Sequence, residues 1–312
     1  MCLWKGCCKS MLDVLIVGGG PAGMTAGLYA ARAGLDSLLL EGELIGGQVS
    51  TTNMLENYPG FPEPIGGPEL MMRFSEQAER AGLKIEYRPV TRFELGGEIK
   101  RLYSGEHVYQ ARSVILTMGA RRRKLGLENE EALVGRGLSY CATCDGAFYR
   151  GKPVAVVGGG ETAVEDALYL AAQSKVTLIH RRDSLRSAGI GARRVMENPN
   201  IQILWNTRVA SAQPSANGLT LRLIDENGQD RPPLEVAGCF VAVGTQPGSE
   251  LLKGQLELDE AGYVVASEDT QTSIPGVFAA GDLRKKPLKQ IVTAVSDGAV
   301  AASMALNWLH NR

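Results

Sequence analysis

The chain lacks the features that would assign it to a membrane, to nucleic acid or to a secretory pathway. No apolar stretch among its 312 residues approaches the roughly 20 residues needed to cross a bilayer. Residues 1–10 lack the apolar core and cleavage site of a signal peptide, and we expect them to be a disordered leader. Lys plus Arg number 33 and Asp plus Glu 34, so charge gives no reason to expect nucleic acid or an anionic membrane as a partner.

Cysteine is also scarce, because six residues do not make a disulfide scaffold in a chain this long. This scarcity predicts a cytoplasmic protein, in which a Cys-x-x-Cys pair needs a redox or metal explanation. The one such pair is Cys141 and Cys144, and no histidine lies near it in sequence, so we expect no metal site. Cys239 lies in an apolar run and is interpreted as a small core residue.

The chain contains a pattern of strand, glycine loop, helix and strand that occurs twice, with an offset of 140 residues. In the first copy, residues 12–17 read as a buried strand, followed by a glycine loop at 18–23, a helix over 24–33 and a strand that ends at Glu41. In the second copy, a strand over 153–157 precedes a loop at 158–163, a helix over 164–172 and a strand over 176–179. The next residues are His180, Arg181 and Arg182.

Each copy is typical of a dinucleotide-binding unit. The first glycine permits the tight turn, the second lets a pyrophosphate approach the backbone, and the third position must be small for helix and strand to pack. The helix N-terminus then offers free N–H groups to the phosphates. One such motif alone could be a structural turn, but two copies with matching flanks predict two nucleotide sites. The matched positions are Gly18 with Gly158, Gly20 with Gly160, and Gly23 with Ala163.

The two sites are distinguished by the residues at the end of the second strand. Glu41 can accept hydrogen bonds from ribose hydroxyls and would repel a phosphate there. The second copy has Arg181 and Arg182 at this place, with Arg186 one helical turn further. Arginine binds phosphate through two parallel hydrogen bonds, so the second site is predicted to prefer NADPH over NAD. The alternative interpretation is a solvated basic patch.

The later apolar strands indicate how the two copies are joined. Strands near 113–118 and 239–243 each end in glycine, and each is expected to lead across a domain boundary. This predicts an α/β protein of two Rossmann-like domains, with the second inserted in the first. The first domain is placed at 11–120 and 246–312, and the second at 121–245. Residues 121–124 are interpreted as a solvated hinge without a catalytic role.

The last segment is expected to complete the first domain. A short strand ends at Asp282, and a helix runs from about residue 289 to about 309. Asp282 could hold the ribityl chain of a flavin, or it could simply cap a helix.

Two nucleotide sites with one dithiol suggest an electron relay from nicotinamide to flavin to disulfide. Cys141 and Cys144 are one turn apart if their segment is helical, which suits a reversible disulfide. Asp145 follows directly and could deliver the proton that a leaving thiolate needs. Its alternative interpretation is a turn residue before Gly146.

Together these motifs resemble the low-molecular-weight thioredoxin reductases, of the class II pyridine nucleotide-disulfide oxidoreductase fold, over residues 11 to about 309. The most specific segments are residues 141–146, 158–163, 180–186 and 272–282, with 46–48 and 56–60 similar to flavin-contacting loops. The resemblance implies a homodimer with non-covalent FAD that passes electrons from NADPH to thioredoxin, and an NADPH domain that swings as a body. It also implies that Cys144 lies against the flavin and that Cys141 exchanges with the partner. The sequence does not decide which cysteine attacks.

The site residues predicted from the motifs and the resemblance fall into three groups. The catalytic group is Cys141, Cys144 and Asp145. The FAD group is Gly18, Gly20, Pro21, Ala22, Glu41, Gly47, Gln48, Asn57, Asp282, Gln290 and Ile291. The NADPH group is Gly158, Gly160, Glu161, Thr162, His180, Arg181, Arg182 and Arg186.

Three departures from the family pattern stand out. Lys289 replaces an arginine that often precedes the glutamine, residues 187–192 are rich in glycine, and residues 1–10 have no counterpart. Alternative functions are a related dithiol flavoenzyme fed by ferredoxin or using oxygen, and a flavin redox sensor without turnover. A peroxide reductase would carry a long N-terminal extension, whereas about ten residues precede the first strand here.

Overall fold

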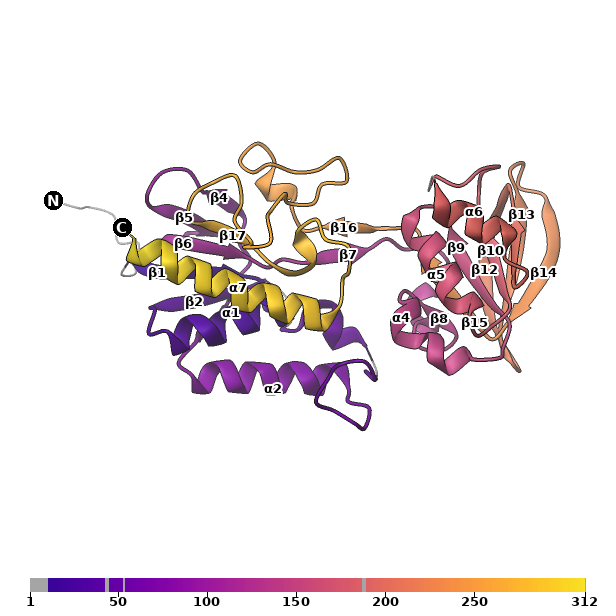
Figure 1. The fold of residues 1–312 in the computed structure, drawn as a ribbon, viewed down its shortest axis with the longest axis horizontal. Coiled ribbons are helices and arrows are strands. Elements are labelled where there is room, and N and C mark those ends of the chain that lie inside the picture. Colours follow the sequence, from indigo (N-terminus) through magenta and orange to yellow (C-terminus); the bar gives the residue numbers. More distant parts are fainter. Residues whose placement is uncertain (1–10, 43–44, 53, 187–188, 312) are drawn as a thin grey trace. The chain divides into compact units, whose positions relative to one another are not determined.

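The computed structural model describes residues 11–42, 45–52, 54–186 and 189–311. The expected leader lies outside the described residues, as do residues 187–188 of the glycine-rich stretch. The chain divides into two compact units (Figure 1), residues 1–121 with 246–312, here the split unit, and residues 122–245, here the inserted unit. None of the described helices is long and apolar enough to cross a membrane.

The split unit is built on one sheet with strand order β3-β2-β1-β6-β5-β4, in which β17 also pairs with β6. Strands β1, β2, β3 and the second half of β6 run parallel, whereas β4 and β5 form antiparallel pairs. Its strands are β1 (Leu12–Val17), β2 (Ser37–Glu41), β3 (Lys84–Tyr87), β4 (Arg92–Glu94), β5 (Lys100–Ser104), β6 (His107–Leu116) and β17 (Val277–Ala279). Its helices are α1 (Pro21–Arg32), η1 (Gly47–Thr51), α2 (Gly67–Arg80), η3 (Glu250–Leu252), η4 (Gly281–Leu283) and α7 (Ile291–His310).

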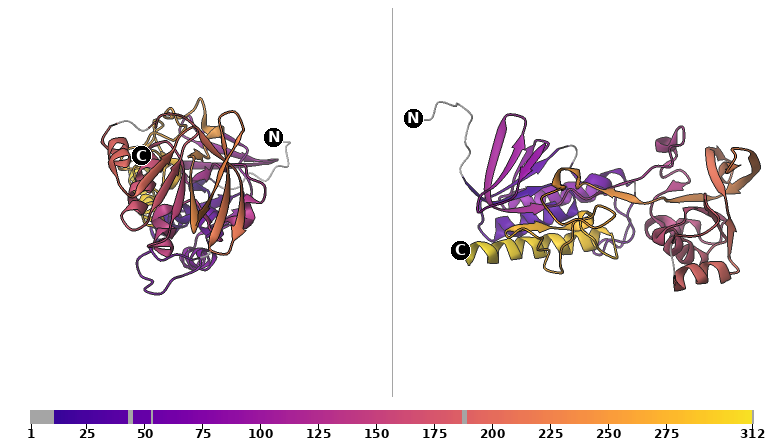
Figure 2. Two further views of the ribbon diagram at one scale, coloured as in Figure 1. Left: turned by 90° about the vertical axis from the view of Figure 1, so that its right-hand side faces the viewer. Right: turned by 90° about the horizontal axis from the view of Figure 1, so that it is seen from above.

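Alternating side chains of β1 divide the core of the split unit into two layers. Val14 and Ile16 pack with α1 and α7, whereas Leu15 and Val17 pack with β5 and the segment around 252–283. Helices α1 and α7 lie side by side (Figures 1 and 2). They approach closely because Gly298 has no side chain, and a Cβ there would overlap the backbone of Ala22. Helix α7 therefore covers α1, the helix that follows the first glycine loop.

The inserted unit repeats the same design on a smaller sheet. Its strands β11-β10-β9-β15-β8 are all parallel, and β12-β13-β14 form a second, antiparallel sheet, which faces the viewer in the left view of Figure 2. The first sheet comprises β8 (Leu138–Ser139), β9 (Val154–Gly158), β10 (Val176–Ile179), β11 (Ile201–Leu204) and β15 (Gly238–Ala242). The second comprises β12 (Thr207–Ser215), β13 (Gly218–Asp225) and β14 (Asp230–Val236). The helices are α3 (Glu130–Leu133), α4 (Ala142–Asp145), η2 (Gly146–Tyr149), α5 (Glu161–Ala171) and α6 (Ile190–Glu197).

The structure confirms the predicted bounds of two strands of the repeat and corrects the predicted starts of its two helices. Strands β1 and β10 have the predicted bounds. Helices α1 and α5 begin at Pro21 and Glu161, three residues before the predicted starts. The reason is that the second half of each glycine motif is the first helical turn, with Gly20 or Gly160 as N-cap, and proline is tolerated in a first turn.

The two segments that connect the units pair with each other. Strands β7 (Ala120–Arg122) and β16 (Thr245–Pro247) form a separate two-stranded sheet. The amide of Gly248 donates to the carbonyl of Gly119 at 3.0 Å. The chain therefore leaves the split unit and returns to it at adjacent points.

Candidate active site

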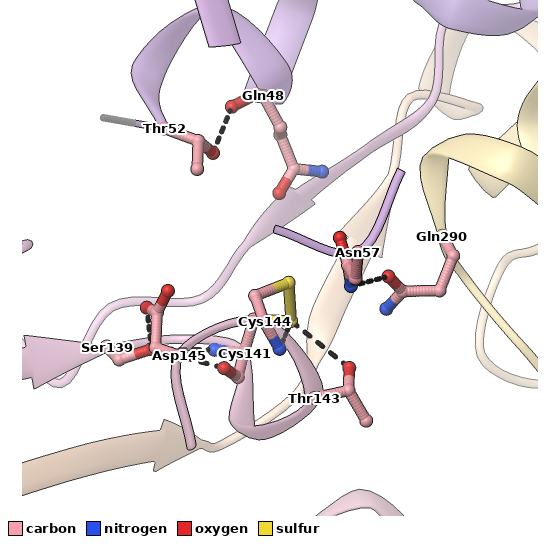
Figure 3. The surroundings of a disulfide bond; sticks show 9 residues. All are labelled: Gln48, Thr52, Asn57, Ser139, Cys141, Thr143, Cys144, Asp145 and Gln290. Carbon is pink, nitrogen blue, oxygen red and sulfur yellow. Dashed lines mark hydrogen bonds between the residues drawn. A yellow bond between two sulfur atoms is a disulfide. The ribbon is translucent and has the colours of Figure 1, made fainter. Parts of the chain in front are cut away.

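The cysteines of the predicted dithiol form a disulfide in the inserted unit. Cys141 is the N-cap of the short helix α4, and Cys144 lies in its first turn, with 5.3 Å between the two Cα atoms. The amide N–H of Cys144 donates to Cys141 Sγ at 3.2 Å, and Thr143 Oγ1 lies 3.4 Å from the same sulfur (Figure 3). Such bonds favour negative charge on a sulfur. The Cys141 sulfur is thus the one whose thiolate the backbone would stabilise.

Asp145 ends α4 and is held by a residue that the sequence analysis did not identify. The hydroxyl of Ser139 donates to Asp145 Oδ2 at 2.6 Å, and the amide of Cys141 donates to Ser139 Oγ at 3.1 Å (Figure 3). Ser139 is only 3% exposed and ends β8, opposite Phe240 of β15. One buried hydroxyl therefore joins the acid to the backbone of the first cysteine. A two-residue strand carries no sequence pattern that would have indicated this contact.

A second unpredicted contact fixes the residue before Cys141. Glu130 accepts hydrogen bonds from the hydroxyl of Tyr140 and from the amides of residues 125, 126 and 127. Burial alone would raise the pKa of Glu130, but these four hydrogen bonds hold it below its ordinary value. Burial and the same carboxylate raise the pKa of Tyr140. The segment that leads into the dithiol is therefore anchored by an ionised carboxylate.

The first glycine loop leads into a helix N-terminus that no side chain caps. Gly20 is the N-cap of α1 without a side-chain cap, and a Cβ on Gly20 would meet nothing within 4 Å. Gly18 has φ +105°, and a Cβ there would lie 2.5 Å from the carbonyl oxygen of Thr117. Pro21 and Ala22 form the first turn of α1. The loop combines a crowded turn with an open helix N-terminus, which fits a bound dinucleotide phosphate.

The remaining predicted FAD residues all belong to the split unit. Glu41 ends β2 and accepts a hydrogen bond from the amide of Gly19 at 2.6 Å. The amide side chain of Asn57 donates to Gln290 at 3.1 Å, which brings together segments 233 residues apart (Figure 3). Gly47 and Gln48 begin η1, with the Gln48 side chain bonded to the carbonyl of Ala120, and Ile291 is the first residue of α7.

Asp282 lies within η4, whose N-cap is Ala280, so it is not the N-cap of that helix. A buried ion cluster, Asp297 with Arg284 and Lys286, supports this turn. Asp297 Oδ2 accepts from the amide of Gly281, from Arg284 Nε and from Lys286 Nζ, each at 2.9 Å. The sequence analysis missed this cluster.

The second glycine loop borders a cavity of about 330 Å³ in the inserted unit. Arg181, Arg182 and Arg186 line it together with Gly158 and His180. A Cβ on Gly160 would lie 3.4 Å from the guanidinium of Arg186, so the loop and the basic cluster adjoin each other. Glu161 and Thr162 form the exposed start of α5 and are not among the lining residues.

Three further cations line this cavity: Arg123, Lys124 and Arg208. Residues 121–124 were expected to be a solvated hinge without a catalytic role; Arg123 and Lys124 are exposed, and both also line this cavity. Both are remote in sequence from the glycine loop, and Arg208 belongs to β12, so only the tertiary fold brings them to it.

His180 differs from the arginines around it. Its ring is 5% exposed, packs against Gly159 and has Nε2 3.0 Å from the carbonyl of Ser184. Burial lowers the pKa of His180, so it is neutral near pH 7. We expect it to shape the loop, while the arginines supply charge.

Cys239 is the only free cysteine among the described residues. It is 1% exposed in a core cluster of the inserted unit, as predicted. Burial raises the pKa of its thiol to about 12, so it is a protonated thiol at neutral pH. Among the described cysteines, Cys141 and Cys144 are therefore the candidates for redox chemistry.

Comparisons with known proteins show the family to which the chain belongs. Residues 12–298 match the family model described as pyridine nucleotide-disulphide oxidoreductase. A thioredoxin reductase of Mycolicibacterium smegmatis is 46% identical over 303 residues, covering 96% of this chain and 97% of the relative. A thioredoxin reductase of Bacillus subtilis is 41% identical over 304 residues, covering 96% of each. The crystal structure of thioredoxin reductase from Streptococcus pyogenes has a TM-score of 0.91 at 40% identity, covering 97% of this chain and 100% of that one. The chain belongs to the pyridine nucleotide-disulphide oxidoreductase family and, within it, to the thioredoxin reductases.

Proposed function

We propose that the protein uses NADPH and FAD to reduce oxidised thioredoxin or a thioredoxin-like protein through the Cys141–Cys144 disulfide, and that it does so as a homodimer. The observation that carries this proposal is the disulfide itself, which the inserted unit holds beside Asp145 and Ser139. FAD is assigned to the split unit, and NADPH to the inserted unit. The cytoplasmic location expected from the cysteine content stays a prediction.

The residues present suit each assigned group. The uncapped N-terminus of α1 and the open space at Gly20 would hold the flavin pyrophosphate. Asn57, Asp282 and Gln290 would hold the rest of the FAD. Arg181, Arg182 and Arg186 would bind the 2′-phosphate of NADPH. When bound, the flavin accepts a hydride from nicotinamide and passes two electrons to the disulfide.

In this proposal, Asp145 transfers the proton, and Cys141 and Cys144 carry out the thiol–disulfide exchange. Reduction breaks the S–S bond and gives two thiolates, and the Asp145 carboxyl transfers one proton to one of them. The other thiolate attacks the partner's disulfide, since the thiolate is the nucleophile in such exchange. This attack forms a mixed disulfide and releases one thiolate of the partner. The protonated cysteine then returns its proton to the Asp145 carboxylate and attacks the mixed disulfide, so the S–S bond of residues 141 and 144 forms again and the partner leaves with both electrons as two thiolates. Thioredoxin has a reduction potential near −270 mV, which calls for a strong reductant such as NADPH.

The NADPH assignment is tested by mixing the flavin-loaded protein with NADPH in the absence of oxygen. We expect the flavin absorbance to bleach, with NADH much less effective. A flavin that stays oxidised with NADPH but bleaches with reduced ferredoxin would replace this assignment with the ferredoxin-fed alternative. The six cations that line the cavity of the inserted unit favour NADPH.

The relay is tested by replacing Cys144 with serine. Cys144→Ser should abolish thioredoxin reduction while leaving flavin bleaching by NADPH intact. Cys239→Ser is the matched control and should keep thioredoxin reduction, because that thiol is buried and protonated. An unchanged rate of thioredoxin reduction in Cys144→Ser would contradict the assigned relay, and a wild-type protein without turnover on any dithiol partner would favour a redox sensor.

A further inference from the structure

Ser139 is an unassigned residue that adjoins both Asp145 and Cys141. Its side chain is buried, comes from a strand rather than from the dithiol helix, and contacts the acid and the backbone of Cys141. Its place is rigid, because β8 pairs with β15 in the register Leu138 to Cys239 and Ser139 to Phe240. A mobile surface serine would not hold one geometry in this way.

The hydroxyl of Ser139 has two acceptors within reach. It donates to Asp145 Oδ2 at 2.6 Å, and the carbonyl of Cys141 lies 3.4 Å away as a second acceptor. A hydroxyl can donate one hydrogen bond and accept two. When Asp145 is ionised, the hydroxyl donates to it. When Asp145 is protonated, the carboxyl can donate to Ser139 Oγ while the hydroxyl turns to the Cys141 carbonyl.

We infer that Ser139 is a positioning residue that sets the proton exchange between Asp145 and the dithiol, by serving as hydrogen-bond partner to both protonation states of the acid. This inference rests on the proposed roles of Asp145 and of the Cys141–Cys144 pair. In the exchange, two electrons break the S–S bond, and the Asp145 carboxyl gives its proton to one thiolate and becomes a carboxylate. On reoxidation by a partner disulfide the proton returns. Ser139 gains and loses no proton overall.

Other titratable groups surround the pair and must be separated from Asp145. Helix α5 packs against α4 and carries Glu165, Asp166 and Tyr169. Burial and the charge of Glu165 raise the pKa of Asp166 to about 7, which places it in the same pH range as a working acid. Tyr149 of η2 lies near enough to Asp145 for the carboxylate to raise its pKa, second to burial. Cys239 of β15 has a pKa of about 12 and stays neutral.

The experiment measures the alkylation of Cys141 and Cys144 as a function of pH. The purified protein is reduced with dithiothreitol, desalted and treated with iodoacetamide, and the peptide that contains both cysteines is followed by mass spectrometry. This readout needs neither NADPH nor thioredoxin, so it is independent of the proposed substrate.

In Ser139→Ala, the carboxylate loses a hydrogen-bond donor. The part of the alkylation-against-pH curve that is lost in Asp145→Asn, here called the limb, should therefore lie about one pH unit higher in Ser139→Ala. A hydrogen bond to a charged group is worth one to two pH units. Ser139→Thr retains the hydroxyl and should restore the original limb. In the Asp145→Asn background, Ser139→Ala should have no effect on the profile.

Three results would overturn the inference. Ser139→Ala could give the wild-type profile, or its shift could persist in the Asp145→Asn background, which would indicate a merely structural role. A shift that disappears in Asp166→Asn would assign the limb to Asp166 instead. If alkylation behaves as expected but thioredoxin is not reduced, the proposed partner is wrong while the role of Ser139 stands.

Discussion

At the scale of single residues, local spacing pointed to the candidate reactive groups but not to the residues that hold them. The three predicted catalytic residues, Cys141, Cys144 and Asp145, lie within five consecutive residues. Their proximity could therefore be predicted from the sequence. Ser139 contacts Asp145 through a buried hydroxyl on a two-residue strand, and Glu130 reaches Tyr140 from a four-residue helix. Contacts of this kind depend on tertiary packing, which no local pattern specifies.

The arginines that line the cavity of the inserted unit give a prediction at this scale. In Arg181→Ala/Arg182→Ala, the 2′-phosphate of NADPH loses charged hydrogen-bond donors worth about 1.5–3 kcal/mol each. The KM for NADPH should rise by at least about tenfold, while the KM for NADH stays the same. Steady-state assays with both nucleotides measure this.

Arg222→Ala is the matched control, because Arg222 pairs with Asp230 at 2.8 Å on the other sheet of the inserted unit. It should leave both KM values unchanged. Equal losses for NADPH and NADH in the double variant would assign these arginines to a part of the nucleotide other than the 2′-phosphate.

At the scale of elements, buried strands were predictable and amphipathic or exposed ones were not. The apolar runs of β1 and β10 indicated their bounds directly. The sheet β12-β13-β14 escaped prediction because its strands are largely half-exposed and contain Pro214, Pro232 and Pro233, residues that usually argue against a strand. Proline is accommodated at both edges of this three-stranded sheet.

In the glycine loop before α1, one substitution is expected to weaken FAD binding and another to destabilise the fold. In Gly20→Ala the new methyl group enters open space, so the free energy of unfolding of the flavin-free protein should change by less than about 0.5 kcal/mol. FAD binding should weaken at least about tenfold, because the methyl group occupies the space assigned to the phosphate. Gly23→Ala should instead destabilise the protein by more than about 3 kcal/mol, since its Cβ would overlap the backbone of Gly18.

Urea denaturation of the flavin-free protein and titration with FAD, followed by flavin fluorescence, measure the two effects. Unimpaired FAD binding by a folded Gly20→Ala variant would refute the assigned phosphate position.

The ion cluster of Asp297 gives a second prediction for an element, the turn η4. The side chains of Asp297, Arg284 and Lys286 are 11%, 9% and 4% exposed, so both cations lose their buried partner in Asp297→Asn. Leaving buried charges uncompensated costs roughly 3–5 kcal/mol. We expect a loss of that size in the free energy of unfolding, measured by urea denaturation.

Glu69→Gln is the control, because Glu69 pairs with Arg73 at 2.6 Å on the exposed face of α2. Exposed pairs contribute at most about 1 kcal/mol. Similar losses in the two variants would mean that the cluster around Asp297 is not a structural support of η4.

At the scale of the whole molecule, the repeat in the sequence predicted two similar units because both glycine loops and both strand ends recur at one spacing. The paired connections β7 and β16 explain how one unit can be inserted without disrupting the other. The pairing of these two segments could not be predicted from their residues, since each is only three residues long.

Removal of the inserted unit tests this organisation. Replacing residues 122–245 by a short Gly-Asn turn should leave a split unit that folds and binds FAD, because the connecting segments already lie side by side. The shortened protein should show flavin absorbance but neither oxidise NADPH nor reduce thioredoxin. The full-length Cys144→Ser variant, which keeps the nucleotide site, is the control. A shortened chain that is folded but colourless would show that FAD binding needs the inserted unit.

The position of β17 and α7 at the end of the chain also has a consequence for biosynthesis. On the ribosome, residues 122–245 emerge as one continuous stretch and can fold as soon as they are complete. The split unit cannot complete its fold at that point. Strand β6 lacks its neighbour β17 until residues 277–279 have been translated, and α1 lacks its neighbour α7 until residues 291–310 have been translated. Until then the edge of β6 and the apolar face of α1 are accessible to chaperones. The nascent chain then consists of a folded inserted unit and an incomplete split unit.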